Sequence, residues 1–234
     1  MSTFQFSTVT PEAVLTKLRN LPSGKSSGSD SVTNELLKLA CTCSPVCDSV
    51  ASLFNRSLAE GVFPDTWKKA VISPILKDGK DPTQPSSYRP IALLSVLSKV
   101  LERLVHEQLL KFFEDNSLLP DEQYGFLRGR STEWQLVSLL EDWHAALDRR
   151  QHVHAAFLDA AKAFDSVDHT ILLTALCDSG ICGTALGWLQ SYLSGRRICT
   201  RVRGCLSPES SITSGIPQGS VLGPLLFLSL WMQL

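Results

Sequence analysis

Two strings of the sequence constrain the fold more than any other feature. The first is FLDAAKAFDSVDH, residues 157–169, and the second is SGIPQGSVLGPLLF, residues 214–227. Residues 152–158 alternate with a period of two, which predicts a β-strand that delivers Asp159 at its end. The second string predicts a tight turn, where glycines allow close backbone approach to a ligand, followed by an apolar helix. A carboxylate at a strand end and a glycine-rich loop are features of a binding site.

The pattern around these strings predicts an α+β fold, because helices alternate with a few separated strands. Thr10 and Pro11 have the residue types preferred at the first positions of a helix, and Gly61 has the type preferred just after one. A helix is predicted to begin at Pro11, with Val14, Leu15 and Leu18 as its apolar face, and further helices at residues 33–40, 49–59, 95–113, 132–149, 168–180 and 184–194. Strands are predicted at residues 67–76, 89–94, 152–158, 198–203 and 210–213.

Composition is that of a globular chain. Hydrophobic residues make up 44% of the 234 residues and the net charge is −1, which excludes the low hydrophobicity and high net charge of disordered chains. Basic residues are nevertheless concentrated in residues 66–111, and residues 183–208 hold four arginines and no acidic residue. These clusters could line a nucleic-acid groove or form two ordinary solvated surfaces, and composition alone favours the solvated surfaces.

The seven cysteines are an odd number, and the sequence does not open on a secretory signal peptide. Reduced thiols are therefore expected, with an intracellular location, nuclear or cytoplasmic, rather than secretion. Cys41, Cys43 and Cys47 lie close together but lack a C-x-x-C pair and a second cluster, which disfavours zinc. No run reaches the length of about 18 apolar residues that a membrane span requires, so no membrane partner is expected.

The order and spacing of the two strings resemble the palm of a reverse transcriptase, most closely that of a non-LTR (LINE-type) retrotransposon. The resemblance implies an RNA-directed DNA polymerase that uses an RNA template, a DNA primer and dNTPs, with two Mg²⁺ ions as cofactor. It implies that Asp159 is the catalytic carboxylate and a metal ligand, together with the backbone carbonyl of Ala160. Phe164 would pack beneath the sugar of the incoming dNTP and exclude a ribose 2′-hydroxyl. Gln218 would contact the nucleotide, and Gly219 the template or primer.

Further segments match the fingers of the same family. SYRPIALLSVLSKVLERL, residues 87–104, resembles a LINE-type finger motif, in which Lys77 and Arg89 would clamp the triphosphate. The segment that starts QYGF resembles a template-side motif and implies template or primer contacts by Gln123, Gly125, Arg128 and Arg130. The resemblance covers roughly residues 10–227. It divides one reverse transcriptase domain into an N-terminal helical segment (1–62), fingers (63–150) and a partial palm (151–234).

The sequence departs from the family after the second string. Family members continue to an aromatic-Ala-Asp-Asp segment, and no such tetrapeptide occurs here. We therefore expect a domain truncated before that motif, inactive by itself, with residues 225–234 lacking a partner surface. A non-catalytic remnant that binds nucleic acid or a partner is the alternative, and a plain helical scaffold is a more distant one. The sequence leaves the oligomeric state open.

Overall fold

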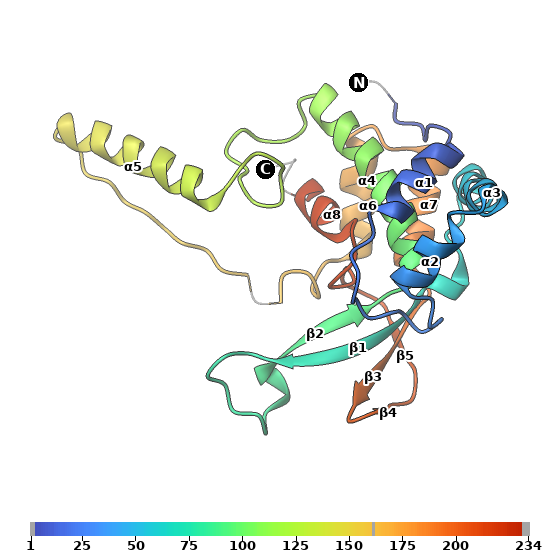
Figure 1. Cartoon of the computed structure of the whole chain (residues 1–234). Helices are drawn as coiled ribbons and strands as arrows, with labels where there is room; N and C mark the ends of the chain where they lie inside the picture. Colours follow the sequence, from blue (N-terminus) through green and yellow to red (C-terminus); the bar gives the residue numbers. More distant parts are fainter. Residues whose placement is uncertain (1–2, 161, 231–234) are drawn as a thin grey trace.

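The computed structural model describes residues 3–160 and 162–230, and its path is shown in Figure 1. The helices are α1 (Pro11–Arg19), α2 (Asn34–Ala40), α3 (Ser44–Glu60), α4 (Val96–Asp115), α5 (Thr132–Asp148), α6 (His169–Asp178), α7 (Gly183–Leu193) and α8 (Gly223–Ser229). The strands are β1 (Lys69–Leu76), β2 (Tyr88–Leu93), β3 (Arg196–Val202), β4 (Cys205–Leu206) and β5 (Ser210–Ile212), and short 3₁₀ turns lie at Asp65–Trp67 and Pro85–Ser87. The predicted α+β fold is confirmed.

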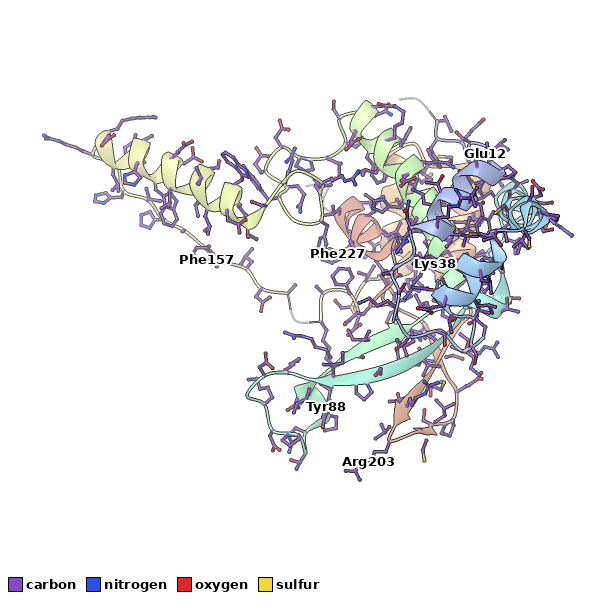
Figure 2. The ribbon with its side chains drawn as sticks, in the orientation of Figure 1. Glu12, Lys38, Tyr88, Phe157, Arg203 and Phe227 are labelled. Carbon is purple, nitrogen blue, oxygen red and sulfur yellow. The ribbon has the colours of Figure 1, made fainter. Side chains whose placement is uncertain are left out.

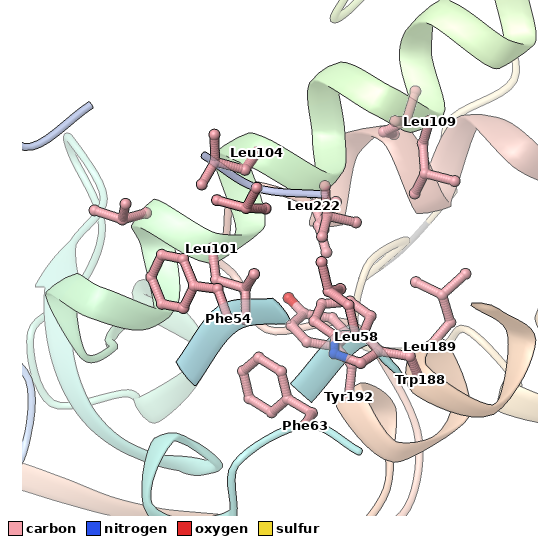
Figure 3. Close-up of a cluster of buried hydrophobic side chains, with 14 of the residues drawn as sticks. Phe54, Leu58, Phe63, Leu101, Leu104, Leu109, Trp188, Leu189, Tyr192 and Leu222 are labelled. Carbon is pink, nitrogen blue, oxygen red and sulfur yellow. The ribbon is translucent and has the colours of Figure 1, made fainter. Parts of the chain in front are cut away.

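The main core lies among the helices. α7 buries residues spaced three and four apart, which is the period of one helix face. The Phe63 ring packs edge-on against Trp188 and Tyr192 of this face, with ring centroids 5.4 Å and 5.0 Å apart. Figure 3 shows these rings in one cluster with Leu101 and Leu104 of α4. α4 therefore packs against the same core as α7, and it connects this core to β2, which precedes it in the chain.

The sheet combines strands that are far apart in the sequence. β1 and β2 form an antiparallel hairpin, and β3 adds to β1 in parallel, with Val71 opposite Cys199. β5 and β4 then pair with β3 in antiparallel orientation. The order β2-β1-β3-β4 joins the predicted finger hairpin to the hairpin that precedes the second string. The GIPQG loop, residues 215–219, begins three residues after the end of β5.

The predicted strand at residues 152–158 is wrong. These residues have no regular structure, and Phe157 and Leu158 are 83% and 96% exposed. They belong to an extended segment that returns from α5, which projects from the helical body (Figure 1) and buries none of its side chains. Figure 2 shows Phe157 on this arm, apart from Phe227. A strand needs a hydrogen-bonded neighbour, and no described segment pairs with this one.

The expectation that residues 225–234 lack a partner surface is also wrong for the part described, residues 225–230. Leu225, Leu226 and Leu228 are buried at 4% exposure or less, and α8 packs against α6. Residues 231–234 lie outside the described part. The other predicted helices and strands are present, although α3 begins earlier than expected, at Ser44.

Among the described residues no single helix is long and apolar enough to span a membrane, and α2 and α3 meet that test only jointly, as a pair bent by 115°.

Candidate functional site

The two strings that dominate the sequence are joined backbone to backbone. The Gly215 N–H donates to the Val167 carbonyl at 2.8 Å, and the Ile216 N–H donates to the Phe164 carbonyl at 2.8 Å. His169 Nε2 lies 2.8 Å from the Gly215 carbonyl, so Nε2 carries a proton in this contact. The start of the GIPQG loop is thereby fixed against the end of the first string.

Glycine is required at Gly215. Its φ is +83°, in the left-handed region that glycine adopts without strain. A Cβ at this position would lie 2.7 Å from the carbonyl oxygen of Asp165, a backbone atom that cannot swing aside. The close approach of the two strings therefore depends on the absence of a side chain at Gly215.

Gln218 connects the first string to the sheet. Its Nε2 donates to the Asp165 carboxylate at 3.0 Å, and its carbonyl accepts from the Ala92 N–H of β2 at 2.9 Å. Gly219 follows with φ +102°, and a Cβ there would lie 3.0 Å from the Ala92 carbonyl oxygen. The loop therefore spans between β2 of the predicted fingers and the end of the first string.

Glu102 is a site residue that the sequence reasoning missed. It is fully buried on α4, and its carboxylate accepts hydrogen bonds from the Val221 N–H at 2.7 Å and the Leu222 N–H at 3.3 Å. Ser98 Oγ and the Tyr192 hydroxyl also donate to it, at 2.8 Å and 3.3 Å. A charged residue within the apolar face of a helix, four residues after a serine, is the signal that could have indicated it. Glu102 holds the segment between the GIPQG loop and α8.

The surroundings of Tyr192 fix its protonation. Burial, and next the Glu102 carboxylate, raise the pKa of this phenol well above its ordinary value. The hydroxyl therefore keeps its proton and acts as a donor to Glu102, which makes the network consistent: every group around the carboxylate donates and the carboxylate accepts.

Phe164 joins three predicted motifs. Its ring stacks on Phe227 of α8 at a centroid distance of 4.8 Å and an interplanar angle of 25°. A second ring contact is edge-on with Phe126 of the QYGF segment, with ring centroids 6.0 Å apart. The half-buried Phe164 is therefore held between the second string and the loop that precedes α5.

A cavity of about 370 Å³ lies between the sheet and the GIPQG loop. Its apolar wall is formed by β1, β2 and β3, and its opposite wall includes Asp165, Pro217 and Gln218. Lys68, Arg196 and Arg197 are also in the lining. The cavity has the size and the mixture of apolar walls with few polar groups that small-ligand sites have.

Comparison with known proteins decides the family. The family model described as "Reverse transcriptase (RNA-dependent DNA polymerase)" matches residues 75–233. The chain belongs to the reverse transcriptase family. The resemblance to LINE-type reverse transcriptases is thereby confirmed.

The relatives of this reverse transcriptase domain are proteins of mobile elements. It is 39% identical over 218 residues to the "Probable RNA-directed DNA polymerase from transposon BS" of Drosophila melanogaster, covering 92% of this chain and 24% of the relative. It is 36% identical over 222 residues to the "RNA-directed DNA polymerase from mobile element jockey" of the same species, covering 94% and 24%. A polyprotein of the type-1 retrotransposable element R2 of Popillia japonica is 34% identical over 173 residues, covering 73% and 23%. The chain spans about a quarter of the length of these curated relatives.

Asp159 and Ala160 are exposed on the extended segment rather than at a strand end. The reverse transcriptase family depends in general on divalent metal. Within the described residues no three His, Cys, Asp or Glu side chains come together as a metal site, and positions 1–2, 161 and 231–234 hold none of these residue types. Among the described residues Asp159 therefore belongs to no cluster of three or more such side chains, and the hard oxygen ligands that two Mg²⁺ ions need are not assembled around it.

The predicted triphosphate clamp lies at the turn end of the β1–β2 hairpin. Arg89 is exposed and pairs with Ile75 across the hairpin. Lys77 follows β1 directly, and its Nζ donates to the Ser86 carbonyl at 3.0 Å. The structure thus brings the two cations to the same end of one hairpin, while Gln218 lies at the other end, beside Ala92.

The predicted template loop is held mainly by its own hydrogen bonds. Gln123 Nε2 donates to the Gly125 carbonyl at 2.9 Å. Arg130 donates through Nη1 to the Pro120, Asp121 and Gln123 carbonyls, and its guanidinium carbon lies 5.9 Å from the centre of the Tyr124 ring. Arg128 is exposed. Arg130 and Gln123 therefore shape the loop, and of the two arginines Arg128 is the one presented to solvent.

Proposed function

We propose that this domain carries out template-directed addition of dNTPs to a DNA primer on an RNA template, as part of a longer polymerase. The observation that supports it best is the junction of the two palm strings, in which Gly215 and Ile216 bond to Val167 and Phe164 and Gln218 bonds to Asp165. A nucleotide site built from both strings requires that the strings be held in a fixed position relative to each other. The division into residues 1–62, fingers 63–150 and a partial palm 151–234 is part of the proposal.

Each predicted residue has a proposed role in the longer enzyme. Asp159 and the Ala160 carbonyl contribute to the binding of two Mg²⁺ ions. Lys77 and Arg89 bind the triphosphate, Phe164 selects against ribonucleotides, and Gln218 contacts the nucleotide. Gln123, Gly125, Arg128 and Gly219 face the template and primer. Arg130 supports this loop, as its three carbonyl contacts indicate.

Primer extension on an RNA template tests this function. A longer protein that contains this domain is expected to extend the primer, and Asp159→Asn is expected to reduce extension by at least about 10³-fold, because catalytic groups act as a unit. Asp48→Asn, a change at an exposed position of α3, is the control and should leave extension unchanged. Full extension by the Asp159→Asn variant would contradict the role of Asp159.

A second candidate function is nucleic-acid binding without catalysis by the 234-residue chain. It is favoured by the exposed position of Asp159 and by the missing metal cluster among the described residues. We expect this chain to retain an RNA–DNA hybrid in a filter-binding assay and to incorporate no dNTP. Asp159-dependent incorporation by the chain itself would eliminate this candidate.

We also propose an intracellular location, nuclear or cytoplasmic. All seven cysteines are free thiols, which suits a reducing compartment. Fractionation of cells that express the tagged chain tests this, and recovery from the medium would contradict it.

A further inference from the structure

Two cysteines face each other across the turn between α6 and α7. The Sγ atoms of Cys177 and Cys182 lie 3.4 Å apart, in hydrogen-bond contact. Cys177 is exposed near the end of α6, and Cys182 is half-buried directly before α7. No other two thiols of the described residues, which include all seven cysteines, form a hydrogen bond with each other. The pair therefore has the arrangement of a dithiol rather than of two separate cysteines.

The two sulfur atoms are within reach of a covalent bond. A disulfide bond is about 2.05 Å long, so the sulfur atoms must approach each other by roughly 1.4 Å. Gly180 lies within the turn and Gly183 directly follows Cys182, and a Cβ at Gly183 would meet nothing within 4 Å. The backbone beside Cys182 therefore has room to adjust while the bond forms.

The surroundings give the two thiols different roles. A thiolate at Cys182 lies at the N-terminus of α7, where the helix dipole is positive and where, in the described part of the chain, no side chain caps the helix. The hydrogen bond with Cys182, followed by burial and the nearby Cys182 and Asp178 charges, raises the pKa of Cys177. The thiolate is the nucleophilic form of cysteine. Cys182 is therefore the thiol that attacks first, and Cys177 the thiol that follows.

Cys182 also lines a cavity of about 670 Å³. The lining combines Cys182 and Thr184 with Asn55 of α3 and the extended residues 3–8. A reagent bonded to Cys182 has space here for its remaining atoms, while Cys177 stays in contact with the same sulfur. The Phe4 N–H donates to the Gly180 carbonyl at 3.0 Å, so the turn between the two cysteines also holds this extended segment.

We propose that Cys177 and Cys182 form a dithiol site that is oxidised by low-molecular-weight disulfides of the glutathione class. The Cys182 thiolate attacks one sulfur of the disulfide, forms a mixed disulfide and releases one thiolate, which takes up the proton that Cys182 lost. Cys177, on losing its proton, attacks the Cys182 sulfur, forms the Cys177–Cys182 bond and releases the second thiol. The cysteine pair thus loses two electrons and two protons, and the reagent gains them. This inference goes beyond the proposed polymerase function, since it requires neither metal nor nucleic acid.

The test is reaction of the fully reduced 234-residue chain with glutathione disulfide, followed by proteolysis and mass spectrometry. We expect Cys177 and Cys182 to lose two hydrogen atoms together and to carry no glutathione. Cys43 and Cys205 are also exposed but have no thiol of the described residues in hydrogen-bond contact, so glutathione that reacts there should stay attached. The Cys177–Cys182 bond should form at least about tenfold faster than glutathione attaches to these two, and excess reduced glutathione should reverse it.

Three variants assign the roles of the two thiols. Cys177→Ser removes the second thiol, so glutathione should remain attached to Cys182. Cys182→Ser removes the first nucleophile and should slow the reaction of Cys177 at least about tenfold. Cys205→Ser, the matched control, removes an exposed thiol of β4 and should leave the rate of formation of the Cys177–Cys182 bond within about twofold of the original.

Two results would overturn the proposal. One is the absence of a Cys177–Cys182 disulfide in the unchanged chain, which is the deciding measurement should a serine variant fail to fold. The other is reaction of Cys177 at its original rate in Cys182→Ser.

Discussion

Glu102 couples two distant parts of the chain through one carboxylate. Replacing it with alanine leaves the Val221 and Leu222 amides and the Tyr192 hydroxyl without their acceptor in a buried region. Each lost bond to a charged group costs about 1.5–3 kcal/mol. We therefore expect Glu102→Ala to lower the free energy of unfolding by at least about 3 kcal/mol, measured by urea denaturation.

The matched control for this change is on the same helix. Glu107→Gln removes an exposed carboxylate that pairs with Lys17 at the surface, and such pairs contribute about 1 kcal/mol or less. A free energy of unfolding for Glu102→Ala as high as that for Glu107→Gln would show that the buried network is not a source of stability.

Substitutions at Gly215 and Gly204 separate two contributions to stability, the cost of a left-handed backbone conformation and the cost of disturbing close packing. Both have φ +83°, but a Cβ at Gly215 meets the Asp165 backbone at 2.7 Å, and a Cβ at Gly204 meets nothing within 4 Å. Gly204→Ala should cost only the left-handed conformation, about 1–2 kcal/mol. Gly215→Ala should cost at least about 1 kcal/mol more because the two palm strings must separate. Urea denaturation of both variants measures the difference, and equal losses would mean that the strings are not tightly joined.

At the scale of elements, local patterns predicted the helices, including α5, which buries no side chain, and failed for one strand. The helix starting at Pro11 begins where the sequence indicates, because Thr10 caps it by accepting from Ala13 N–H. Gly61 ends α3 with φ +66°, as its residue type predicts. The alternation at residues 152–158 predicted a strand and failed, because alternation specifies which faces are apolar but not what pairs with the backbone. A strand forms only with a neighbour.

The arm formed by α5 and the extended segment after it should exchange its amide protons faster than the body. α5 buries no side chain, and residues 151–160 are all exposed. Helices obtain most of their stability from packing, so α5 should open locally at low free energy, whereas α4 and α7 should open only with the whole core. Hydrogen–deuterium exchange with mass spectrometry measures this on the scale of seconds to hours. Protection of α5 equal to that of α7 would indicate a packing partner for the arm in solution.

At the scale of the whole molecule, sequence order predicted which segments form the site but not how they touch. The two strings and the predicted finger hairpin were singled out from their residues, and the structure joins the hairpin to both strings through Gln218. Glu102 was not identified, because its charge within an apolar helix face indicates no partner by itself, and the partners that use it lie 90 and 119 residues away, at Tyr192 and Val221. Such long-range contacts leave no periodic signal in the sequence.

The stability of the whole molecule should fall in two steps as the pH is lowered. Burial lowers the pKa of His106 on α4, with the nearby Glu107 opposing it. The unfolded chain thus takes up a proton near pH 6.5, before the folded one does, and stability is lost as the pH falls below about 6.5. Hydrogen bonds from the Ile171 and Thr170 N–H groups lower the pKa of Asp168, and that of Glu209 is lowered by Lys69. Their contributions are present above about pH 4 and are lost below it.

Urea denaturation at intervals from pH 8 to pH 3 measures both steps. His106→Gln should abolish the first step and keep the second, because glutamine does not titrate and leaves the carboxylates unchanged. Asp168→Asn should reduce only the second, because an amide oxygen still accepts at the start of α6 but carries no charge. A first step that persists in His106→Gln would assign it to another group, and the burial of His106 would then not control stability near neutral pH.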